Sequence, residues 1–113
     1  MDSILNSIKK LLGLTTEQTD FDEDLIMHIN TVFTILNDLG VGPKEGFAIE
    51  GVYETWYDYM QDKLQFEKVK TYMALKVKLY FDPPQNSSLI VAIERRIDEL
   101  EWRLTASAEN TTE

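Results

Sequence analysis

The chain has 113 residues, a formal net charge of −9 and no cysteine. Its 43% hydrophobic and 11% aromatic content can supply a core for one domain spanning residues 1–113. The missing cysteines exclude disulfide scaffolds and thiolate zinc sites, and the acidic balance argues against a general nucleic-acid binder. The longest apolar runs, such as Leu89–Ile93, fall far short of the roughly 20 residues that span a bilayer. The N-terminus lacks the pattern of a signal peptide.

Apolar residues at helical spacing predict two helices in the first third of the chain. The first runs from about Ser3 to Leu12, and Gly13 supplies its C-terminal stop. The second begins with Asp20 as its cap, Glu23 completes a capping box, and Gly40 ends it. The acidic residues of its first turn suit the helix dipole. Its apolar stripe consists of Leu25, Ile29, Val32, Leu36 and Leu39.

From Val41 to Asp62 the helical period is lost, and glycine and proline interrupt the chain. The alternation of Phe47, Ile49 and Val52 is compatible with a short extended piece. The stretch Thr55–Met60 contains Trp56, Tyr57 and Tyr59, too many aromatic residues for a bare loop. We expect a short helical turn there that attaches this long segment to the core.

A third helix is predicted from about Leu64 to Phe81, where the Asp82–Pro84 stretch stops it. Apolar residues surround most of its circumference, so several neighbours should bury it. One apolar side consists of Leu64, Tyr72, Leu75 and Leu79; the other consists of Phe66, Val69, Met73, Val77 and Tyr80.

A fourth helix should start at Ser87 or Ser88, both good caps, and run to about Ala106. Residues 107–113 form a polar tail that we expect to fray. The predicted fold is all-α: a small bundle of about four helices with a long aromatic-containing loop between the second and third. The core stripe of the predicted fourth helix consists of Leu89, Ile93, Ile97, Leu100 and Leu104.

The sequence offers no convincing catalytic, cofactor or metal site. His28 is the one histidine and falls at the edge of an apolar stripe, which is typical of a boundary position. The acidic run from Asp20 to Asp24 lacks the ligand order of a calcium loop and fits helix-start electrostatics. The glycines between Gly40 and Gly46 follow a helix instead of a strand, contrary to a phosphate loop.

Charge is distributed unevenly, with acid concentrated from Glu17 to Asp58 and lysine on the third helix. Two interpretations of these lysines remain open: a solvated strip that offsets acidic neighbours, or a surface that docks onto an acidic partner or DNA phosphates. The lysines concerned are Lys63, Lys68, Lys70, Lys76 and Lys78.

A second face on the fourth helix is the best candidate site. Trp102 lies roughly 200° from Leu100 at about 100° per residue, away from the core stripe. Either the first helix or the aromatic segment covers this face, or it is an interface with another subunit, where tryptophan and arginine are enriched. The candidate interface residues are Val91, Arg95, Asp98, Trp102 and Arg103.

Several stretches together resemble the head–tail connector (adaptor) proteins of tailed bacteriophages and prophages. They are Lys70–Tyr72, Leu75–Leu79, the Phe81-Asp82-Pro83-Pro84 break, Ser87–Ser88, Ala92–Ile93, Ile97 and Glu99–Leu104. The Leu39–Pro43 turn and Trp56 add to the resemblance, which covers about Ser3 to Ala106.

This resemblance implies a non-enzymatic structural protein without cofactors. Copies would form a ring beneath the portal, link head to tail, and extend a channel through which DNA passes without specific binding. The implied partners are the portal and a downstream neck or tail protein, with no membrane. The implied location is the head–tail junction of the virion, with the host cytoplasm during assembly.

It also implies that the fourth helix around Trp102 and Arg103 faces the portal, while the second and third helices pack against the next copy. The segment Val41–Asp62 would face the lumen or the next neck component. A cytoplasmic helical interaction module or small regulator is the alternative function. An enzyme is the least favoured, because no nucleophile–base pair, metal cluster or phosphate loop is visible.

Overall fold

The structure is a computed structural model that describes the backbone of residues 3–111 and the side chains of residues 3–108. Helices account for most of this range and no strand occurs in it, which confirms the all-α prediction. An isolated bridge joins Ser3 to Thr55. The helices are α1 (Ile4–Leu11), α2 (Asp22–Asp38), α3 (Trp56–Tyr59), α4 (Lys63–Phe81) and α5 (Ser87–Thr111).

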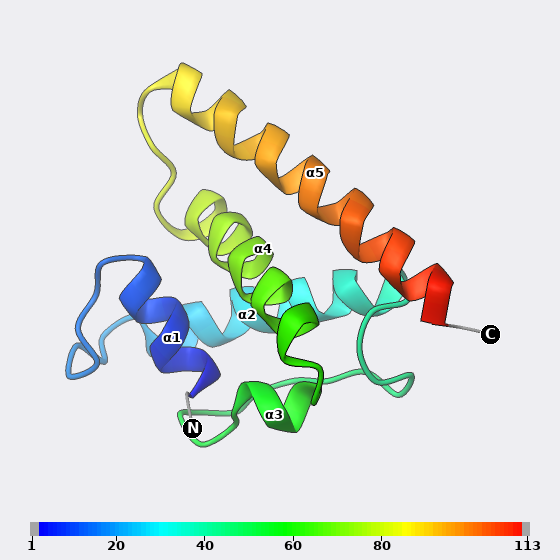
Figure 1. Cartoon of the computed structure of the whole chain (residues 1–113). Helices are drawn as coiled ribbons and strands as arrows, with labels where there is room; N and C mark the ends of the chain where they lie inside the picture. Colours follow the sequence, from blue (N-terminus) through cyan, green and yellow to red (C-terminus); the bar gives the residue numbers. More distant parts are fainter. Residues whose placement is uncertain (1–2, 112–113) are drawn as a thin grey trace.

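Helix α4 is the central element of the fold. It packs against α2 and α5, and α1 contacts both α2 and α4 (Figure 1). Short α3 lies at the end of the bundle opposite the α4–α5 connection (Figure 1). Because α4 has neighbours on several sides, most of its circumference can be apolar without being exposed.

The core confirms this prediction for α4, with two exceptions. Val69, Met73 and Val77 are completely buried. Leu64, however, is 79% exposed and Tyr80 is 41% exposed, so their assignment to buried sides was wrong. Leu64 lies in the first turn of α4, whereas Tyr80 lies near the other end of the helix and has the His28 ring of α2 on one side.

Two glycines end helices as predicted. Gly13 and Gly40 have φ angles of 84° and 82°, in the left-handed region that glycine adopts without steric cost. After α2, the Gly40 amide donates to Asn37 and the Val41 amide donates to Leu36. This pair of bonds is a Schellman motif, and it satisfies carbonyls that the last turn leaves without helical partners.

The helix starts differ from the predicted caps. Helix α2 begins after Phe21 without a side-chain cap, so the capping box at Asp20 was wrong. The acidic first turn of α2 is present, but Asp22 pairs with Lys9 of α1. Helix α5 starts at Ser87, but the capping side chain is Asn86, whose Oδ1 accepts from the Ser88 amide at 2.8 Å.

The aromatic segment, Thr55–Met60, is attached to the core as expected. Thr55 and Asp58 form a capping box for α3, and Trp56 is 2% exposed. The expected extended piece forms no strand; the Asn30 amide instead binds the backbone of Ile49 in both directions, at 2.8 and 3.0 Å. A side-chain amide can replace one rung of a β-ladder because it has the same donor and acceptor.

Helix α5 continues to Thr111, beyond the end predicted near Ala106. Residues 112 and 113 of the expected frayed tail lie outside the described residues. Among the described side chains of α5, three are buried, Ile97, Leu100 and Leu104, and none of them lies in its first ten residues. The beginning of α5 therefore extends beyond the closely packed part of the bundle (Figure 1).

Candidate functional site

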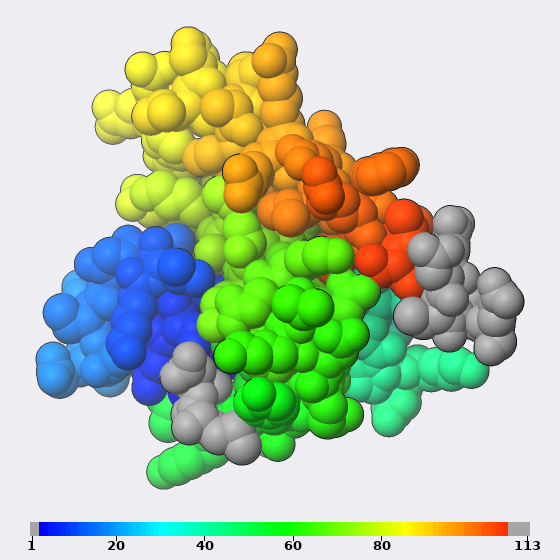
Figure 2. All heavy atoms as spheres, viewed as in Figure 1, coloured from blue at the N-terminus to red at the C-terminus, as the bar shows by residue number. Residues whose placement is uncertain are grey.

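The candidate face of α5 is open to solvent. Trp102 is 71% exposed and Val91 is 46% exposed, so neither α1 nor α3 covers the face. The alternative of an internal cover was therefore wrong. In the space-filling view, α5 lies along the outer edge of the molecule (Figure 2). All the predicted interface residues are exposed on it: Val91, Arg95, Asp98, Trp102 and Arg103.

This exposure follows from how α5 is held. Only one side of the helix packs on α4, and residues about half a turn away from that side meet solvent. A tryptophan left 71% exposed is uncommon, since its large ring favours burial or an interface. The face is therefore the strongest candidate for contact with another protein.

The exposed charged residues of α5 are of both signs. Glu94 and Asp98 line a cavity of about 430 Å³ between α4 and α5, together with Lys76. Arg95 and Arg96 are exposed and form no ion pair within residues 3–108. Because Asp98 shares the exposed face with Arg95, this face carries both signs of charge.

A polar contact that sequence reasoning missed fixes α5 on α4. The Tyr72 hydroxyl donates to Glu101 Oε2 at 2.7 Å, and Lys76 Nζ lies 4.0 Å from the same oxygen. Burial, and then the bond to Glu101, raise the pKa of Tyr72. The phenol is therefore neutral and acts as a donor at physiological pH. No short-range pattern indicated this pair, whose members are 29 residues apart.

A second missed contact joins α1 to the start of α2. Lys9 is fully buried, and its ammonium lies 2.8 Å from Asp22 Oδ1 and 3.3 Å from the carbonyl of Thr16. A signal for it did exist, because Lys9 lies between Leu5 and Leu12 on the apolar side of α1. A buried charge needs such partners to offset its desolvation.

The remaining candidates for chemistry have structural roles. The His28 ring is half-buried beside Tyr80, with ring centroids 5.6 Å apart, which agrees with its predicted boundary position. Among the described side chains, no group of three or more histidine, aspartate and glutamate residues could hold a metal ion. Within the same part of the chain, no helix is long and apolar enough to cross a membrane.

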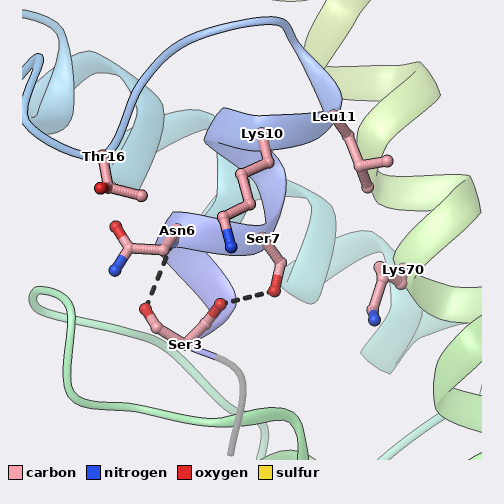
Figure 3. Close-up of a pocket in the computed structure, with 7 residues that line it drawn as sticks. All are labelled: Ser3, Asn6, Ser7, Lys10, Leu11, Thr16 and Lys70. Carbon is pink, nitrogen blue, oxygen red and sulfur yellow. Dashed lines mark hydrogen bonds between the residues drawn. The ribbon is translucent and has the colours of Figure 1, made fainter.

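A surface pocket of about 380 Å³ lies beside α1 (Figure 3). Its two serine hydroxyls are already used locally: the Ser3 hydroxyl accepts from the Asn6 amide, and the Ser7 hydroxyl donates to the Ser3 carbonyl. Lys10 and Lys70 approach the pocket from two helices (Figure 3).

The lysines of α4 favour the solvated-strip interpretation. Lys78 lies 3.0 Å from Asp82, and Lys70 lies 3.5 Å from Glu67. The Lys76 ammonium is shared between Glu101 and the rings of Tyr72 and Tyr80. These partners offset the positive charge of Lys70, Lys76 and Lys78, whereas Lys63 and Lys68 form no ion pair within residues 3–108.

The fold and the exposed face of α5 together indicate a class of protein. The protein has an all-α fold whose candidate site is an exposed helix face instead of a reactive cleft, which is typical of proteins that act by binding other proteins. A family model described as "Phage connector protein" matches residues 4–111. The chain therefore belongs to the phage connector protein family. Searches of curated proteins and of solved structures found no match.

Proposed function

We propose that this protein is a structural component of the phage neck that forms a ring beneath the portal. The ring links head to tail and extends the DNA channel. The observation that carries this proposal is the match to the connector family over residues 4–111, in a chain that leaves a tryptophan-bearing helix face exposed. The protein acts by contact alone, without a cofactor. It resides at the head–tail junction of the virion, after assembly in the host cytoplasm.

Two surfaces of the molecule suit different partners. The second half of α5, around Trp102 and Arg103, is the portal side in this proposal. Arg103 already pairs with Glu99 at 3.2 Å, so it has a defined position beside the tryptophan. The segment Val41–Asp62 faces the lumen or the next neck protein. Tyr53 is its most exposed large residue, at 90%.

The acidic balance supports a conduit that does not retain DNA. The net charge is −9, and Lys70, Lys76 and Lys78 of α4 have acidic or aromatic partners. Negative charge repels phosphates over about one Debye length, roughly 10 Å at 0.1 M salt. DNA therefore passes without specific binding.

The test is to mix the purified protein with its cognate portal and examine the complex by negative-stain electron microscopy. The expected result is added ring-shaped density at the tail-side end of the portal. Trp102→Ala should reduce that density. Tyr53→Ala, which also removes an exposed aromatic ring, is the matched control for the portal contact. Portal particles without added density would contradict the proposal.

A further inference from the structure

The turn before α3 presents an exposed tyrosine at its tip. Tyr53 is 90% exposed, and Val52 beside it is 39% exposed. In Figure 1, the segment that leads into α3 lies at the lower end of α4, whereas α5 runs along the upper right of the molecule. The turn and α5 can therefore contact different partners at the same time.

The Glu54 carboxylate holds this turn closed. Its two oxygens accept from the Glu50 amide at 2.7 Å and from the Gly51 amide at 3.3 Å. A carboxylate is a strong acceptor for backbone amides, because its charge shortens and strengthens the hydrogen bonds. The two bonds close residues 50–54 into one turn, with the exposed Val52 and Tyr53 at its tip.

Both ends of the turn are fixed to helices. The backbone of Ile49, which precedes the turn, is bound by the side chain of Asn30 in α2. At the other end, the Ile4 amide of α1 donates to the Glu54 carbonyl at 2.9 Å. A side chain on a prearranged turn loses less conformational entropy on binding than one on a free loop. Tyr53 meets this condition, and tyrosine offers a large contact area with few torsions to fix.

The charge around the tip is negative. Residues 45–62 contain five carboxylates and no basic residue. The carboxylates belong to Glu45, Glu50, Glu54, Asp58 and Asp62. Lys44 and Lys63 flank this stretch, and of the two lysines in the pocket beside α1, Lys70 pairs with Glu67. The other, Lys10, does not reverse the balance. This charge disfavours contact with DNA phosphates and favours a protein surface that carries basic residues.

We propose that Tyr53 is the anchor through which this protein binds the tail-side component of the neck, and that Glu54 positions the anchor. The partner surface has an apolar pocket for Tyr53 and Val52, rimmed by lysine or arginine side chains near Glu50. This inference rests on the proposed function, because it assigns the second contact of a ring whose first contact is the portal. Of the two surroundings given for the segment Val41–Asp62, it selects the next neck protein.

A head–tail joining assay tests the contact. Phage heads that carry the portal but lack this protein receive the purified protein and then purified tails of the same phage. Joined particles and ring density on the portal are both counted by negative-stain electron microscopy. Tyr53→Ala should keep the ring density but lower the joined fraction roughly tenfold or more, because an interface anchor is lost. Tyr53→Phe keeps the aromatic ring and should retain most of the joining.

An exposed apolar residue elsewhere provides the control. Met27 of α2 is 57% exposed and lies outside the segment, so Met27→Ala should leave ring density and joining unchanged. Equal denaturation midpoints for the natural protein and both alanine variants establish that each one is folded. Natural joining with Tyr53→Ala, or an equal loss with Met27→Ala, would overturn the assignment of the anchor.

The role of Glu54 is tested by removing and restoring its acceptor. Glu54→Ala should speed hydrogen exchange of the Glu50 and Gly51 amides and lower joining, while the ring density persists. Glu54→Gln keeps an oxygen that can accept from these amides, and should recover most of the joining. Faster exchange of the two amides with undiminished joining would contradict the positioning role.

Charge reversal at the tip tests the basic rim of the partner. The Glu50 side chain is exposed, and only its backbone amide takes part in the turn. Glu50→Lys should therefore lower joining without opening the turn, and the loss should be largest at low salt, where screening is weakest. Joining that stays unchanged at low salt would overturn the basic rim.

The two readouts separate this inference from the proposed function. Ring density with natural joining in the Tyr53 and Glu54 variants would retain the neck role and overturn the anchor. Natural joining with altered DNA ejection in Tyr53→Ala would place Tyr53 in the lumen and also overturn the anchor. Absence of ring density with the natural protein would contradict the neck role, and the inference with it.

Discussion

The two tryptophans of the chain lie in regions with opposite surroundings. Trp56 belongs to the four-residue helix α3 and is 2% exposed, whereas Trp102 belongs to the long helix α5 and is 71% exposed. Trp56 packs beside Phe66, and its indole donates to the Ser7 hydroxyl at 3.2 Å. The comparison teaches that helix length does not decide burial. Trp56 lies on the side of the short α3 that faces α1 and α4, whereas Trp102 lies on a side of α5 that has no neighbour.

The comparison predicts a large loss of stability at the first tryptophan. Trp56→Ala should lower the free energy of unfolding by about 3–5 kcal/mol, because it leaves a cavity between α1, α3 and α4. Chemical denaturation measures this loss. An unchanged midpoint would mean that the aromatic segment is not attached to the core in solution.

The central helix supplies the next largest effect. Met73→Ala should cost about 2–5 kcal/mol, since the Met73 side chain is completely buried. Leu75→Ala should cost less, because Leu75 is only half-buried. Equal losses at the two positions, measured by the same denaturation assay, would show that α4 is not covered as unevenly as the structure indicates.

The free energy of unfolding should depend on pH through the Tyr72–Glu101 hydrogen bond between α4 and α5. Because burial and the Glu101 bond raise the pKa of Tyr72, the unfolded chain loses this proton above about pH 10 while the folded chain keeps it. The free energy of unfolding should therefore fall as pH rises past that value. Tyr72→Phe should remove about 1–3 kcal/mol at neutral pH by leaving Glu101 without its donor.

Denaturation series above and below pH 10 measure this dependence. The decline should be less steep in Tyr72→Phe than in the natural protein. Part of the decline should persist, because burial also raises the pKa of Tyr59. Identical slopes for the two proteins would indicate that the Tyr72 phenol titrates normally in the folded state.

The smallest effect on stability is expected at the second tryptophan. Trp102→Ala should change the free energy of unfolding by about 0.5 kcal/mol or less, as is usual for exposed positions. Binding to the portal should nevertheless weaken. Denaturation of the monomer and a portal pull-down measure the two quantities separately. A large loss of monomer stability with unchanged binding would reverse the roles assigned to the tryptophans.

Local sequence patterns predicted much of the fold, because the features concerned depend only on residues close in the chain. Gly13 and Gly40 end helices because only glycine adopts their backbone angles without cost, and that property depends on no distant residue. Trp102 was predicted to lie off the core stripe because helical spacing fixes its direction relative to Leu100. The helix starts were harder, since Asn86 and Ser87 are both good caps and their residue types do not choose between them.

The sequence by itself determined the helical class, most helix ends, the absence of thiol chemistry and the direction of the Trp102 face. Only the tertiary structure decided which faces stay exposed. Periodicity gives the direction of a side chain, but exposure depends on whether another helix lies there, and Leu64 and Trp102 lack such a neighbour. The same holds for the partners of Lys9 and Tyr72, because their contacts join segments whose proximity arises only on folding.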